Sequence, residues 1–154
     1  MVIYILALLI GVIAGLRAMT APAAISWAAF LGLVNLEGTW LAFLGYRFTP
    51  WIVTVLAIGE LIGDQLPTTP SRKTPLPFAT LIIVGALCGG AIAAQGGSIL
   101  GGVVAGAVGG IMGTLGGAEG RARLAAAFGK DRPAALIEDA VAILGAFLIV
   151  GAIP

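Results

Sequence analysis

Long apolar runs separated by short polar segments dominate this chain. The runs cover residues 2–33, 51–66, 78–94, 99–115 and 134–153. A helix needs about 20 predominantly apolar residues to cross a hydrocarbon core of roughly 30 Å, and each run is near or above that length. The pattern therefore predicts an all-α membrane protein, a single domain of residues 1–154 with about five transmembrane helices.

The first apolar run is too long for one straight crossing, and Arg17 and Pro22 interrupt it. Proline removes a backbone donor and clashes with the preceding turn of a helix. We expect one crossing that breaks or kinks near residues 17–22. A re-entrant hairpin is the alternative.

Residues 119–133 carry most of the basic side chains that surround the last two runs. Arginines and lysines alternate there with an apolar stretch at residues 124–128, which favours a short amphipathic helix at the membrane interface. The loop at residues 67–77 is also basic, whereas the loops expected on the other side hold Arg47 alone. The positive-inside rule then predicts a membrane protein with a cytoplasmic N-terminus and an external C-terminus.

Composition agrees with this picture. Hydrophobic residues make up 60% of the chain and charged residues 10%, whereas soluble domains carry about 25% charged residues. Cys88 is the only cysteine and histidine is absent, so a disulfide, a zinc cluster or a Ser-His-Asp triad cannot form within the chain. The net charge of +1 gives no long-range field, so we expect no nucleic-acid partner. We also expect no metal, no cofactor and no enzyme activity. The lipid bilayer is the expected partner.

A faint internal repeat is visible when the chain is shifted by 98 positions. The shift places Gly11 on Gly109, Gly15 on Gly113, and residues 28–30 on residues 126–128. Glycine and alanine are so common here that chance matching is the alternative. A true duplication, with two crossings, one extra crossing and two crossings (2+1+2), would be the inverted repeat of many secondary transporters.

Arg17, Glu60 and Asp64 are the main candidate site. An ionisable group inside hydrocarbon costs several kcal/mol unless it is paired or hydrated. Glu60 and Asp64 are four residues apart and therefore share one helical face. Two interpretations remain open: a binding site for a proton, cation or small anion, or a structural lock between an arginine and its carboxylates.

Four further charged residues are secondary candidates: Glu119, Arg121, Glu138 and Asp139. Glu138 and Asp139 follow Pro133 in the first turns of the last predicted helix, where acids favour the positive end of the helix dipole. We expect them to cap that helix and to pair with Arg121 or Arg123. If the repeat is real, they are instead the symmetry mates of Glu60, and Glu119 faces the same polar pocket.

The fourth run is dense in glycines spaced for close helix packing, as in a glycine zipper. They are Gly102, Gly106, Gly109, Gly110, Gly113 and Gly117. Small residues at this spacing let another helix approach within van der Waals contact. The partner helix could lie in the same chain, in a second copy, or in a larger membrane complex.

Three segments carry a resemblance to a known family: residues 15–22 (GLRAMTAP), 59–67 (GELIGDQLP) and 132–139 (RPAALIED). In combination they resemble a bacterial integral membrane family catalogued as a domain of unknown function, number four-one-two-six, over nearly the whole chain. The resemblance implies a multi-pass protein of the bacterial inner membrane and no established activity. From the residues themselves we expect a small-solute or ion transporter or channel, with a structural or assembly subunit that binds lipid or another membrane complex as the alternative.

Overall fold

The computed structural model describes residues 2–36, 39, 41–63, 75–129 and 131–153, and all regular secondary structure in these ranges is helical. The α-helices are α1 (Val2–Leu16), α2 (Thr20–Phe30), α3 (Thr49–Gly63), α4 (Pro75–Ala93), α5 (Ile99–Phe128) and α6 (Asp131–Gly151), with a short 3-10 helix, η1 (Ala42–Gly45), before α3. The expected all-α class is confirmed. The bundle contains six α-helices, whereas the apolar runs predicted about five crossings.

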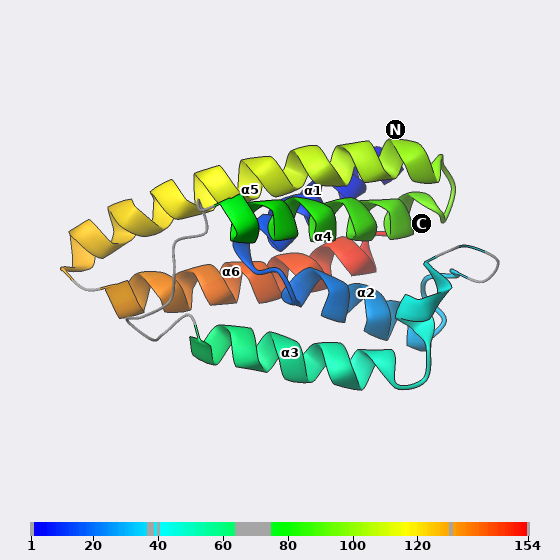
Figure 1. Cartoon of the computed structure of the whole chain (residues 1–154), viewed down its shortest axis with the longest axis horizontal. Helices are drawn as coiled ribbons and strands as arrows, with labels where there is room; N and C mark the ends of the chain where they lie inside the picture. Colours follow the sequence, from blue (N-terminus) through cyan, green and yellow to red (C-terminus); the bar gives the residue numbers. More distant parts are fainter. Residues whose placement is uncertain (1, 37–38, 40, 64–74, 130, 154) are drawn as a thin grey trace.

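Successive helices run in alternating directions along the bundle (Figure 1). The contacts that α6 makes with α1 and α2 show that these two helices run in opposite directions. Asp139 meets Arg17 and Gly145 meets Ile13, so α6 runs antiparallel to α1. Conversely, α2 and α6 run in the same direction (Figure 1), and both line one cleft. The first apolar run therefore folds as a helical hairpin.

The expected break near residues 17–22 is confirmed, and the chain reverses direction there between α1 and α2 (Figure 1). The last α1 hydrogen bond joins the Arg17 amide to the Ile13 carbonyl, and α2 resumes with the Ala23 amide bonded to the Met19 carbonyl. Pro22 lies in the first turn of α2, where an amide needs no intrahelical partner. The proline therefore begins a new helix and does not kink an old one.

The short helix expected at residues 119–133 is not a separate element, because residues 119–128 continue the helix of the fourth apolar run. One helix, α5, continues for 30 residues, from an N-cap at Ser98 to Gly129, whose φ of 72° ends it in a left-handed conformation. Glu119 and Arg123 form an ion pair one turn apart at 2.7 Å within it. That pair and the following alanines favour helix strongly enough to offset the neighbouring glycines.

The two chain ends lie at the same end of the molecule (Figure 1). The expectation of termini on opposite sides of a membrane counted residues 2–33 as one crossing, whereas these residues form two helices, α1 and α2, that run in opposite directions. The faint repeat is not a repeat of structure. Residues 2–30 form a helical hairpin, whereas the residues matched to them by the 98-position shift belong to one continuous helix.

Glycine contacts draw α5 against both α1 and α4. A Cβ added at Gly106 would overlap the carbonyl oxygen of Gly85 in α4, and one at Gly11 would overlap the carbonyl oxygen of Gly106. A Cβ added at Gly109 or Gly113 would overlap the α1 backbone, and one at Gly102 would overlap Gly89 of α4. A Cβ added at Gly110 would lie within 3.2 Å of the α4 backbone. Gly117 is half-buried further along α5. Of the six glycines expected to pack closely, five therefore contact helices of the same chain: Gly102, Gly106, Gly109, Gly110 and Gly113.

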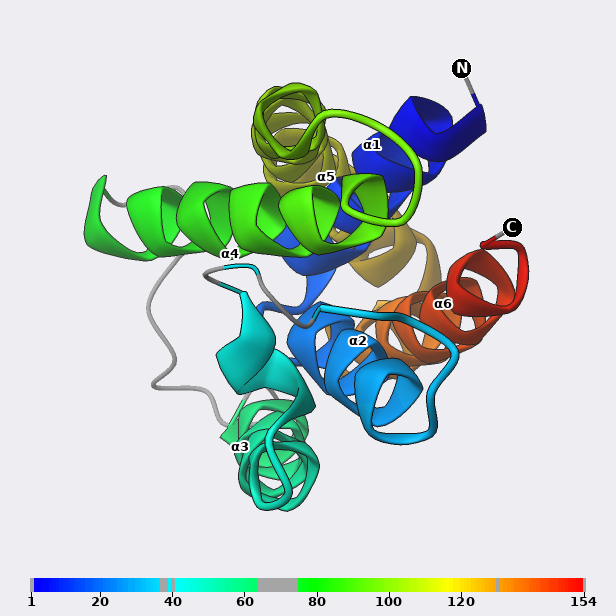
Figure 2. The ribbon, with the colours of Figure 1, turned by 90° about the vertical axis from the view of Figure 1, so that its right-hand side faces the viewer.

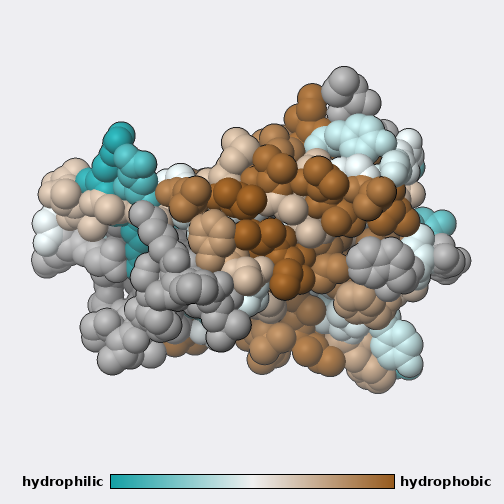
Figure 3. All heavy atoms as spheres, turned by 45° about the horizontal axis from the view of Figure 1, so that its top comes forward, coloured by the Kyte–Doolittle hydropathy of each residue, from teal (hydrophilic) through white to brown (hydrophobic). Residues whose placement is uncertain are grey.

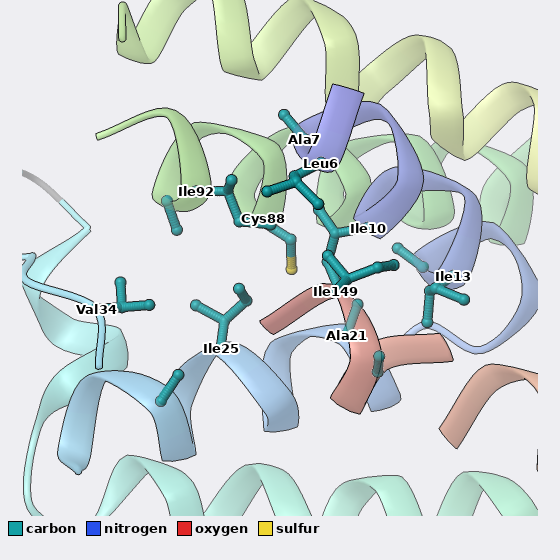
Figure 4. Close-up of a cluster of buried hydrophobic side chains, with 14 of the residues drawn as sticks. Leu6, Ala7, Ile10, Ile13, Ala21, Ile25, Val34, Cys88, Ile92 and Ile149 are labelled. Carbon is teal, nitrogen blue, oxygen red and sulfur yellow. The ribbon is translucent and has the colours of Figure 1, made fainter. Parts of the chain in front are cut away.

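The apolar core lies where α1, α2, α4 and α6 face one another. Figure 4 shows Ile10 of α1, Ile25 of α2, Cys88 of α4 and Ile149 of α6 pointing into this space. In the end-on view of Figure 2, α3 lies at the edge of the bundle beside α2. The core thus joins the first hairpin to α4 and α6, while α3 stays at the periphery.

Large apolar side chains cover much of the outside. On α3, α5 and α6, residues such as Val55, Leu100 and Leu148 are about two-thirds exposed or more. Brown, apolar atoms cover the middle of the face in Figure 3, and teal atoms gather near the end where α5 projects. By length and composition, α5 is the one described helix that could cross a membrane, and Val2–Leu16, Thr49–Glu60 and Phe78–Ala93 are shorter apolar helices.

Candidate functional site

The turn between α1 and α2 is held by a carboxylate from another helix. Glu60 of α3 accepts hydrogen bonds from the amides of Ala18 at 2.7 Å and Met19 at 2.9 Å. The N-cap residue of α2, Met19, makes no side-chain capping hydrogen bond. Glu60 thus supplies acceptors for amides that the break leaves outside the helical ladder, at the positive end of the α2 dipole.

Arg17, the residue just before this turn, is completely buried. Its Nε donates to Oδ1 of Asp139 at 2.5 Å, its Nη2 makes an ion pair with the same oxygen, and its Nη1 donates to the carbonyl of Leu16 at 3.2 Å. Nη2 also lies 3.7 Å from Oε2 of Glu138. Two adjacent acids of α6 therefore neutralise the arginine that ends α1.

A second arginine extends this network along α5. Nη1 of Arg121 lies 3.7 Å from the same Glu138 oxygen that faces Arg17. Side-chain exposure rises from 0% for Arg17 to 6% for Glu138 and 18% for Arg121. Charges of alternating sign therefore lead from the interior toward the surface. The residues Arg17, Glu60, Arg121, Glu138 and Asp139 are called the charge cluster below.

Burial makes these ion pairs energetically consequential. Removing a guanidinium or carboxylate from water costs several kcal/mol, which is offset only when the opposite charge is close and well oriented. Asp139 meets this condition with two contacts to the same guanidinium. Glu138 is shared between two arginines at longer range. Within the cluster, Asp139 is the tightly held acid and Glu138 the acid placed between two positive charges.

The structure places the site residues predicted from the sequence in different surroundings. Glu60 lies at the turn next to Arg17, as a cap for the two following amides. Asp64 lies outside the described residues. The expected pairing of Glu138 with Arg121 is observed, but the expectation missed Arg17, which contacts both α6 acids. Two adjacent acids in an otherwise apolar helix were the signal that could have revealed this.

Glu119 does not face the cluster, contrary to its assignment to the same polar pocket. Its side chain is 63% exposed and pairs with Arg123, which is 79% exposed. Both residues line a shallow surface depression with Gly116 and Gly120. They therefore serve below as a surface reference for variants of the charge cluster.

An apolar cleft of about 200 Å³ opens beside the cluster, between α2, α3 and α6. Thr20, which follows the turn that Glu60 caps, lies in its wall. Trp27 donates from Nε1 to Oγ1 of Thr54 at 2.7 Å and also lines the cleft. Across the ranges that the structure covers, no three acids, cysteines or histidines gather as metal ligands do.

No protein-family model, curated protein or solved structure matches the chain. The described contacts join residues of three sequence segments that lie far apart in the chain. Glu60 binds the turn at residues 17–19, and Glu138 and Asp139 contact Arg17.

Proposed function

We propose that this chain is a multi-pass membrane protein. Its support is the exposed apolar surface: α3, α5 and α6 turn large aliphatic and aromatic side chains outward over most of their length. Soluble monomers rarely expose contiguous apolar patches larger than a few hundred Å². Lipid contact would bury these side chains. At about 1.5 Å per residue, the 30 residues of α5 would cross the bilayer and project beyond it.

The alternating helix directions suggest a revised orientation. Arg121 and Arg123 lie toward the end where α5 meets α6, whereas both chain termini lie at the opposite end (Figure 1). The positive-inside rule favours a cytoplasmic position for the basic end. The N-terminus would then lie outside together with the C-terminus, and not in the cytoplasm.

Tags fused separately to the two ends should therefore be reached from the same, external side of intact cells or right-side-out vesicles. Labelling with an impermeant reagent measures this, and a tag inserted after Gly129, at the basic end, is the matched control that should be protected. Termini on opposite sides would contradict six alternating crossings.

We further propose that the protein carries a small ion across the membrane, with the proton as the first candidate. One observation carries the proposal: a completely buried arginine at a helix reversal contacts two adjacent carboxylates, and a second, partly exposed arginine contacts one of them, Glu138. Intramembrane ionisable residues at broken helices are typical of ion pathways. Carboxylates can also bind and release protons directly, and Glu138 lies between two competing positive charges.

The described conformation is closed at the cluster, because Arg17 has no exposed surface. Ion movement therefore requires a rearrangement that gives water access to Asp139 or Glu138. Protonation of either carboxylate would weaken its attraction to Arg17. Proton binding and a change in helix packing are coupled in this mechanism.

Purified protein in liposomes tests the proposal. An imposed pH gradient should dissipate faster than in protein-free vesicles, as measured by an internal pH-sensitive dye. Parallel vesicles with sodium, potassium or chloride gradients identify another small ion if protons do not move. Absence of flux under every gradient would contradict transport.

A structural or assembly role is the second candidate, and the complete burial of Arg17 favours it. A guanidinium enclosed by Asp139 and Glu138 is also what a permanent lock between α1 and α6 requires. In that role the protein would bind lipid or another membrane complex. Isolation in mild detergent should then recover a reproducible partner or lipid, and a chain that always purifies alone would count against it.

A further inference from the structure

The helix α3 is attached to the rest of the bundle at few points. It packs against α2 and η1, at the edge of the molecule (Figure 2). From Trp51 to Glu60, every residue of α3 is exposed or half-buried. By contrast, α1 and α5 carry runs of fully buried residues. Elements with few buried contacts open at lower free energy than core helices.

Two sets of contacts hold α3 against α2, one near each end. Near the cluster, both carboxylate oxygens of Glu60 accept backbone amides of the α1–α2 turn. Toward the other end, Thr54 accepts the Trp27 indole hydrogen bond, and the rings of Trp27 and Trp51 meet edge to face at 5.1 Å. Between these points, Ala57 and Ile58 border the apolar cleft and not a packed core.

The Glu60 contact differs from the others in kind. It is a charge-assisted pair of hydrogen bonds from one side chain of α3 to the main chain next to Arg17. Such bonds are roughly twice as strong as neutral ones and strongly directional. They also depend on the ionised form, since only a carboxylate offers two equivalent acceptors. A single residue therefore links the position of α3 to the turn that carries the buried arginine.

We propose that Glu60 is a latch: it holds α3 against the α1–α2 turn, and its release lets α3 move away from α2 and α6 and opens the charge cluster. The inference rests on the proposed transport function for its purpose, because it names the rearrangement that gives water access to Arg17. Movement of α3 would free the amides of Ala18 and Met19. It would also widen the cleft that Thr20 borders.

Distances between spin labels on α3 and α6 test the latch. Val55 and Leu144 are exposed and suit labelled cysteines, in a Cys88→Ala background. With Glu60 present, one distance population should dominate. Glu60→Ala removes both charge-assisted bonds, so a longer-distance population should rise about tenfold or more. Glu119→Ala, which removes only an exposed pair, should leave the distances unchanged.

Glu60→Gln keeps the latch testable if the alanine variant loses its helical circular dichroism. Glutamine retains one acceptor, so its longer-distance population should lie between those of the parent and of complete latch loss. An unchanged distance distribution in Glu60→Gln and in any folded Glu60→Ala would overturn the latch. The spin-label distances are measured without transport, so the two proposals can fail separately. Movement of α3 without ion flux would support the latch and contradict the transport function. Ion flux with an immobile α3 would support transport and contradict the latch.

Discussion

Replacing Arg17 with methionine should lower the free energy of unfolding by about 3–5 kcal/mol, the largest effect expected of any single substitution in the charge cluster. The reason is that Asp139 would lose its positively charged partner. Asp139 would stay buried without the guanidinium that contacts it through two nitrogens, whereas Glu138 would keep Arg121 at 3.7 Å. Denaturant titration in detergent, followed by far-ultraviolet circular dichroism, measures the change.

Two comparisons make the Arg17 result specific. Glu119→Gln, in the exposed pair with Arg123, should change stability by less than about 1 kcal/mol. The double variant Arg17→Met with Asp139→Leu should recover much of the loss, because no unpaired charge remains at that contact. Equal losses in Arg17→Met and Glu119→Gln would show that the buried pair has no special role in the fold.

Gly106→Ala should destabilise the bundle by about 3 kcal/mol, because α5 touches two helices at this residue. The added methyl group would overlap the carbonyl oxygen of Gly85, and the carbonyl of Gly106 itself lies where Gly11 of α1 approaches. Neither neighbour is a flexible side chain that could rotate away. Thermal unfolding of the purified protein measures the loss, because the α4 backbone must shift to accommodate the added methyl group.

Gly116→Ala is the matched control on the same helix. A Cβ there meets nothing within 4 Å, so the substitution should be neutral or stabilise the helix by up to about 1 kcal/mol. If both alanine variants unfolded alike, the glycines would contribute through helix propensity alone, and close packing of α5 would not explain them.

Local sequence patterns predicted much of the helical content. The expected runs at 51–66, 78–94 and 134–153 overlap α3, α4 and α6 closely, because apolar length and flanking prolines and polar residues are local signals. No local sequence signal revealed that the chain reverses direction after Arg17. A proline in the first turn of a new helix and a proline that kinks an existing helix look the same in sequence, and the difference here involves Glu60, 41 residues from Met19.

The charge cluster was recognised in part for the same reason. Arg17 stood out because a cation at the end of an apolar run demands a partner, and Glu60 stood out as an acid in a similar position. The sequence did not reveal that Glu60 binds the backbone beside Arg17, or that Asp139, 122 residues away, binds the guanidinium. Spacing along one helix identifies a shared face, but it does not identify which distant helix that face meets.

The rate of proton flux through Asp139→Asn, compared with wild type in matched liposomes, tests the central claim most directly. Asparagine keeps the size of the side chain and removes its charge, and helical circular dichroism confirms equal folded protein in both preparations. If the charge cluster is the transport site, flux should fall at least about tenfold, while Glu119→Gln keeps the wild-type rate. Wild-type flux through a folded Asp139→Asn protein would contradict the proposal and leave the cluster as a structural lock.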